Sequence, residues 1–196
     1  MPTAFFRALA AGSCIGTEHE YSINDKSQRA LAISDQIIER IAGRLDHEVA
    51  FGGILVSKEL QKHAIELIPH RPGGLGFLEE NLYQGLCQLY HATNHEYAFM
   101  GLGMHPLLRL DETACWDHDE QEYYQTYDRL FNIRQHGWLN IQALQINIPY
   151  RGKRDLVAMF NKIRALMPYL VAVSASSPLV EGKATSYMDN RLVYYR

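Results

Sequence analysis

The feature that most constrains the fold is the alternation of polar and apolar residues in short segments that lie between amphipathic helical stretches. Residues 15–23 alternate in this way, and residues 63–68 repeat the pattern. Residues 139–148 form a further strand candidate, closed by Pro149, which cannot donate to a sheet ladder. Strands that are polar on one face are typical of antiparallel sheets covered on one side only. The sequence therefore predicts an α+β fold, an antiparallel sheet with helices packed on one face.

Three segments have the spacing of helices. Ser34 is a plausible N-cap for a helix that includes Ile37. Apolar residues recur at three- and four-residue intervals over residues 77–93. Residues 156–170 show the most regular helical stripe, and we expect that helix to end within residues 174–178.

The remaining glycine and proline positions favour one folded unit. Gly52 and Gly53 predict a turn or bulge between two short strands, and residues 98–104 predict an apolar strand. The Pro/Gly stretch at residues 69–76 is too short to be a linker. We therefore expect a single domain over residues 1–196.

Composition argues against several classes of partner. The 196 residues include 19 basic and 22 acidic side chains, and no dense basic run that would bind nucleic acid. No apolar run approaches the ~20 residues that cross a bilayer, so we expect no membrane partner. Three cysteines without a C-x-x-C pair fit a reducing compartment. These features predict a cytoplasmic protein.

Two glutamates on the first predicted strand, Glu18 and Glu20, are two positions apart and project from one face. Like charges held close are costly unless a cation lies between them, and carboxylates suit Mg²⁺. A solvated strand face is the alternative interpretation. Glu66 lies in an apolar stretch and needs a partner, which could be a metal ion, Lys58 or Lys62.

A pair of amides occupies the strand predicted over residues 139–148. Gln145 and Asn147 share one face of this strand by its two-residue period. Amides on a sheet face usually hydrogen-bond to their neighbours. Taken alone, the pair favours this structural role over a binding one.

Four separated motifs, in this order, resemble one family. They are Gly-x-Glu-x-Glu-Tyr at residues 16–21, Glu-Leu-x5-Glu-Leu at 59–67, a glycine-containing stretch ending in His-Pro at 101–106, and Ser-Ala-Ser-Ser-Pro at 174–178. Together they resemble the glutamate–cysteine ligase type 2 and related carboxylate–amine ligases. The resemblance extends from residue 16 to residue 196.

The resemblance implies the N-terminal part of a glutamine-synthetase-like catalytic domain. It implies an ATP- and Mg²⁺-dependent ligase that joins a carboxylate, such as that of glutamate, to an amine, such as cysteine, through an acyl phosphate. The positions that match metal ligands on two adjacent strands are Glu18, Glu20, Glu59 and Glu66. Gln145 and Asn147 match positions that line the substrate site. ATP and an amino acid are the implied small-molecule partners.

The chain departs from the family pattern in two ways. Gln145 replaces a histidine, and an amide has no acid–base capacity. Further strands that follow the Ser-Pro segment in the family do not follow it here, so we expect a homo-oligomer or a partner chain that completes the sheet. A non-catalytic member that binds a nucleotide or an amino acid is the alternative. A metal-dependent hydrolase ranks lowest, because strand alternation turns His19 and His63 away from the glutamates.

Overall fold

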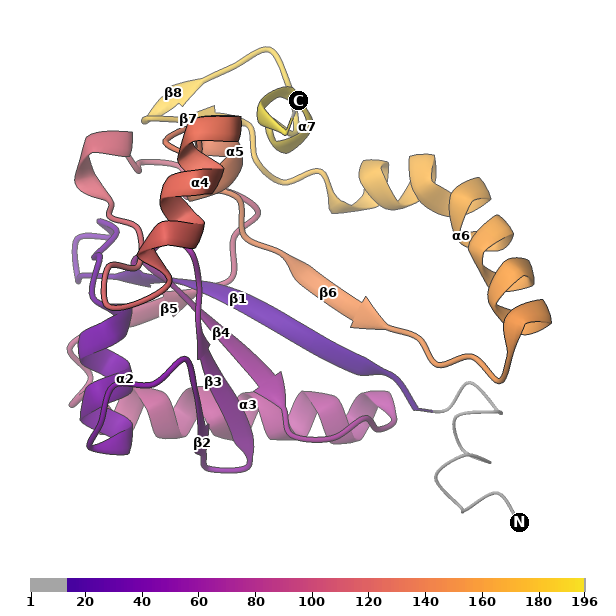
Figure 1. Ribbon diagram of the computed structural model, residues 1–196, viewed down its shortest axis with the longest axis horizontal. Helices are drawn as coiled ribbons and strands as arrows, with labels where there is room; N and C mark the ends of the chain where they lie inside the picture. The colour runs from indigo at the N-terminus through magenta and orange to yellow at the C-terminus, as the bar shows by residue number, and fades with distance from the viewer. Residues whose placement is uncertain (1–13, 196) are drawn as a thin grey trace.

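The computed structural model describes residues 14–195, and its centre is a six-stranded antiparallel sheet (Figure 1). The strands are β1 (Gly16–Asn24), β2 (Glu48–Phe51), β3 (Ile54–Lys58), β4 (Ala64–Pro69), β5 (Ala98–Met100) and β6 (Leu144–Asn147). Their order is β2-β3-β4-β1-β5, and β6 also pairs with β1. β5 pairs with the C-terminal half of β1 and β6 with its N-terminal half. This sheet and its helices confirm the predicted α+β class.

Helices α2 (Ser34–Ala42) and α3 (Leu75–Ala92) cover one face of the sheet (Figure 1). The side chains that alternate toward this face form the core, because β1, β2, β3 and β4 each contribute apolar residues two positions apart. The fully buried members of this core from the strands and helices are Ile23, Ile37, Ile38, Ile54, Val56, Ile65, Leu67 and Leu89. The opposite face of the sheet is therefore where the polar members of the strands project.

A two-residue turn joins β2 to β3, as predicted. Gly52 has a φ of 58° and Gly53 a φ of 92°, a left-handed backbone that glycine adopts at little cost. Such turns match the twist of a two-stranded hairpin. The turn sets the register in which Glu48 faces Ser57.

Further elements lie outside the sheet, after its first five strands. They are η1 (Leu110–Glu112), α4 (Gln121–Phe131), α5 (His136–Leu139), α6 (Lys153–Ser174), β7 (Leu179–Val180), β8 (Lys183–Ala184) and α7 (Arg191–Tyr194). α6 stands apart from the sheet (Figure 1), and none of its residues is buried. It ends at Ser174, as predicted. By length and composition alone α6 could cross a membrane.

Three predicted boundaries differ from the structure. Ile33, not Ser34, is the N-cap of α2; the backbone N–H of Ser34 donates to the carbonyl of Lys62, so the helix begins at Ser34 itself. The strand predicted over 98–104 ends at Met100. The strand predicted over 139–148 shortens to β6, because the chain before it forms α5 and a turn held by side chains.

That side-chain link involves His105. Its backbone N–H donates to Asn140 Oδ1 at 2.9 Å, and Asn140 Nδ2 donates back to the His105 carbonyl at 3.2 Å. His105 Nδ1 accepts from the N–H of Leu108 at 3.0 Å, which leaves Nε2 to donate to Asn24 Oδ1 at 2.8 Å. The connection after β5 is thereby fixed over the C-terminal end of β1.

Candidate active site

Register aligns a row of polar side chains across four strands. Glu20 of β1 pairs with Glu66 of β4, Glu66 with Ser57 of β3, and Ser57 with Glu48 of β2. Directly opposed residues in an antiparallel sheet point to the same face. Glu18 lies two residues before Glu20 on that face. The sheet therefore brings Glu18, Glu20 and Glu66 together on the side away from α2 and α3.

Glu59 reaches the same place from a connection. It follows the end of β3, and its carboxylate lies with those of Glu20 and Glu66 in a group whose oxygens are all within 4.8 Å of one another. The expectation that all four glutamates lie on two adjacent strands was wrong in this respect. Three elements supply them: β1, β4 and the turn between β3 and β4, where the chain has already left the ladder.

Burial, and then the charges of neighbouring carboxylates, raise the pKa values of Glu20, Glu59 and Glu66. Burial, and then the charges of Glu20 and Glu66, raise the pKa of Glu59 from 4.5 to about 8. Burial, and then the charges of Glu18 and Glu20, raise the pKa of Glu66 to about 7. Burial also raises the pKa of Glu20, against hydrogen bonds from the Ala143 backbone and Gln145 that lower it. Without a cation, the cluster therefore holds protons near neutral pH.

The two lysines considered as partners of Glu66 are paired elsewhere. Lys58 Nζ lies 2.8 Å from Glu120 Oε2, and Lys62 Nζ lies 2.6 Å from Asp35 Oδ2. Over residues 14–195, no lysine or arginine forms an ion pair with any of the four glutamates of the cluster. The ion-pair interpretation of Glu66 is wrong, and the cluster lacks a protein cation.

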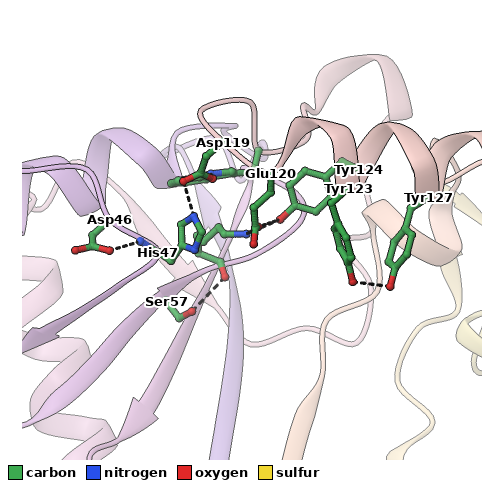
Figure 2. Close-up of polar contacts among 10 residues, drawn as sticks. Asp46, His47, Ser57, Asp119, Glu120, Tyr123, Tyr124 and Tyr127 are labelled. Atoms are coloured by element: carbon green, nitrogen blue, oxygen red, sulfur yellow. Dashed lines mark hydrogen bonds and ion pairs between the residues drawn. The ribbon is translucent and has the colours of Figure 1, made fainter.

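A polar network that includes His47, Asp119, Glu120 and Tyr124 lies beside the cluster (Figure 2). Lys58 also donates to the Tyr124 hydroxyl, and His47 Nε2 lies 2.6 Å from Asp119 Oδ2. Burial lowers the pKa of Lys58, but the hydrogen bonds to Glu120 and Tyr124 outweigh it and the net pKa is raised. This network ties the end of β3 to the start of α4, immediately beside Glu59. Its partners are 62 to 72 residues apart in sequence, so sequence spacing gave no signal for it.

The amides of β6 contact the carboxylates. Asn147 Nδ2 donates to Glu18 Oε1 at 2.7 Å, and the Gln145 side chain lies near Glu20, where it lowers the pKa of that carboxyl group. The Asn147 amide thus orients the Glu18 carboxylate with its N–H group. The structure therefore places both residues at the candidate site, beside the glutamates.

A cavity of about 260 Å³ borders Glu20. Gly101, Gly103, Ser176 and Arg191 also line it, so the motifs at residues 101–106 and 174–178 meet at one place. A Cβ atom at Gly103 would lie 2.6 Å from Ser177 Oγ, which explains the glycine there. Arg191 is held beside the cavity by Asp189, at 2.6 Å.

The histidines of the two motifs lie outside the carboxylate group. His63 is fully buried, and its Nδ1 lies 2.8 Å from Thr113 Oγ1. Burial lowers its pKa to about 3, so it stays neutral. His19 faces the other side of β1 from Glu18 and Glu20. The described cluster offers oxygen ligands only.

This donor set fits Mg²⁺. Hard divalent cations prefer carboxylate oxygens, and Glu20, Glu59 and Glu66 each offer one within a span that a single ion can bridge. A cation would also remove the mutual repulsion that raises their pKa values. Two other acidic groups, around Asp35 and Asp119, already contain Lys62 and His47 as partners.

Comparison with known proteins identifies the family. The model of glutamate-cysteine ligase family 2 matches residues 14–196. This chain belongs to that family.

Its relatives include both named and unnamed proteins. An uncharacterized protein of Archaeoglobus fulgidus is 49% identical over 183 residues, which cover 93% of this chain and 50% of the relative. A glutamate–cysteine ligase of Halobacterium salinarum is 28% identical over 191 residues, 94% of this chain and 49% of that protein. A chloroplastic glutamate–cysteine ligase of Brassica juncea is 25% identical, over 90% of this chain and 37% of that protein. The chain spans about half the length of the archaeal relatives.

Proposed function

We propose that this chain forms part of an ATP- and Mg²⁺-dependent ligase that joins a carboxylate to an amine. The observation that supports this most is the convergence of four glutamates that pair with no lysine or arginine among residues 14–195. Membership in the glutamate–cysteine ligase family supports the reaction class, with glutamate as the acid and cysteine as one candidate amine. We also propose a cytoplasmic location.

The residues have distinct roles in this proposal. Glu18, Glu20, Glu59 and Glu66 would hold Mg²⁺, which screens the charge between a triphosphate and a substrate carboxylate. Asn147 keeps Glu18 oriented through its amide N–H group, and Gln145 and Asn147 would contact substrate at the edge of the cluster. Phosphorylation of the substrate carboxylate by ATP, followed by displacement of phosphate by the amine, would give the amide.

The cavity beside Glu20 suits a small polar substrate. Arg191 and Ser176 give its lining a guanidinium group and a hydroxyl group, and two glycines let a ligand approach the backbone. We propose that the acid substrate binds here with its reacting carboxylate toward the glutamates.

Metal binding is the direct test. Mn²⁺, a paramagnetic stand-in for Mg²⁺, should bind the 196-residue chain and lose its free-ion electron paramagnetic resonance signal. Glu66→Gln should weaken this binding at least tenfold, whereas Glu79→Gln, an exposed glutamate on α3, should leave it unchanged. Equal binding by wild type and Glu66→Gln would refute the site.

A non-catalytic member that binds ligands without turnover is the second candidate. Gln145 favours it, because the amide cannot transfer a proton. ADP release from ATP, glutamate and an amine separates the two candidates. We expect little or no release by this chain alone, and turnover by a chain shown by light scattering to be monomeric would contradict that expectation.

A further inference from the structure

The apolar stripe of α6 has no partner among residues 14–195. The stripe is defined by residues that recur at four- and three-residue intervals along one side of the helix: Leu156, Phe160, Ile163, Met167 and Leu170. Leu156, Phe160, Met167 and Leu170 are 39–58% exposed. An amphipathic stripe of this width normally packs against another element. Here it faces solvent along the whole length of the helix.

The strand that precedes α6 is also open. Glu20 N–H donates to the Ala143 carbonyl, so the odd-numbered residues of this strand direct their backbone groups at β1. The N–H groups of Leu144 and Ile146 therefore point to the other edge of β6. Within residues 14–195, no strand pairs with that edge. The side chains of Leu144 and Ile146 are 61% and 56% exposed.

A lipid bilayer does not fit this surface well. Lys162 and Arg164 lie near the middle of α6, where a charged side chain is costly in a membrane-spanning helix. An exposed strand edge is equally unsuited to hydrocarbon, because its backbone groups need hydrogen-bond partners. A polypeptide that has a strand edge and an apolar face satisfies both needs.

We propose that the free edge of β6 and the stripe of α6 dock a polypeptide equivalent to the half of the archaeal relatives that the match does not cover. The match reaches 50% and 49% of two of those relatives, so each contains about as many residues again. The occupant adds a strand to β6 and covers Met167 and Leu170. This inference concerns association alone and does not depend on metal binding at the glutamates.

Complex formation tests the proposal. The uncovered half of the Archaeoglobus fulgidus relative is expressed as a separate polypeptide and titrated against the 196-residue chain. We expect a 1:1 complex by light scattering, with slower amide hydrogen exchange in residues 144–147 and 153–174. Absence of a complex, or a complex that leaves exchange in both segments unchanged, would overturn the proposal.

Matched substitutions on one helix sharpen the test. Leu170→Lys should weaken the complex at least tenfold, whereas Tyr169→Lys should change affinity less than twofold, although Tyr169 is the more exposed of the two at 69% against 54%. Ile146→Pro removes an N–H group from the free edge and should also weaken the complex. Equal effects at 169 and 170, a homodimer that Leu170→Lys dissociates, or protection of α6 only by phosphatidylcholine vesicles would each show another occupant. Neither lysine variant can disturb the core, since α6 has no buried residue.

Discussion

Replacing Glu59 by glutamine should stabilise the metal-free protein. The folded cluster holds the pKa of Glu59 at about 8, against 4.5 for an unperturbed carboxyl group. Because the folded pKa is the higher one, the folded state binds more protons between these two values, and the free energy of unfolding falls as pH rises from 4.5 to 8. At pH 7 the loss amounts to ~3 kcal/mol, since ~1.4 kcal/mol accrues over each of the roughly 2.5 pH units above 4.5.

Glutamine cannot ionise, so Glu59→Gln avoids this loss. In EDTA at pH 7 the variant should be more stable than wild type by up to ~3 kcal/mol, and the difference should vanish near pH 4.5. Mg²⁺ should largely cancel this difference, because it binds only the wild-type cluster tightly. A hundredfold excess over Kd adds ~2.7 kcal/mol.

Urea unfolding at pH 4.5, 6, 7 and 8, with EDTA or with Mg²⁺, measures these quantities. Glu79→Gln, on the exposed side of α3, is the control and should stay within ~0.5 kcal/mol of wild type at every pH. The reasoning fails if Glu59→Gln is no more stable than wild type in EDTA at pH 7. It also fails if the wild-type stability does not decline between pH 4.5 and 8.

Three further outcomes are expected. Mg²⁺ with ATP should raise the melting temperature of wild type more than either ligand alone, and a melting temperature that ignores both would favour a chain that binds neither. Gln145→His should tighten Mn²⁺ binding, since imidazole is the stronger ligand; unchanged affinity in a titration would place residue 145 outside the metal's reach. Lys58→Met should lower the free energy of unfolding by ~1–2 kcal/mol, because it breaks the ion pair with Glu120 and removes the hydrogen bond that Lys58 donates to the Tyr124 hydroxyl. For that variant, urea midpoints equal to those of wild type and of the exposed control Lys26→Met would be the contrary result.

Sequence predicted the parts of the fold that depend on neighbours in the chain. Alternation at residues 16–24 fixed which side chains share a face, and the pair Gly52–Gly53 located the hairpin turn. The helix boundary at Ser174 was also predictable. These features follow from backbone geometry over a few residues.

Features set by distant contacts were not predictable. Residues 136–139 form α5 because the side chain of Asn140 hydrogen-bonds to the backbone of His105, 35 residues away. Likewise, Lys58 and Lys62 were equally plausible partners of Glu66 until α4 and the loop before it supplied Glu120 and Asp117. For the candidate site, strand parity predicted that Glu18 and Glu20 share a face, whereas the position of Glu59 beyond the end of β3 required the fold.

The row of polar residues across β1 to β4 has a consequence for how the chain reaches its native state. If β4 paired with β1 one residue out of register, Glu66 would turn into the layer that contains Ile23 and Leu89, and an unpartnered carboxylate there is costly. The same slip would turn Ile65 and Leu67 out to water. A one-residue slip therefore raises the free energy of the sheet in two ways, through the buried carboxylate and through the exposed apolar side chains. The glutamates of the candidate site thus also favour the native register of β4 on β1.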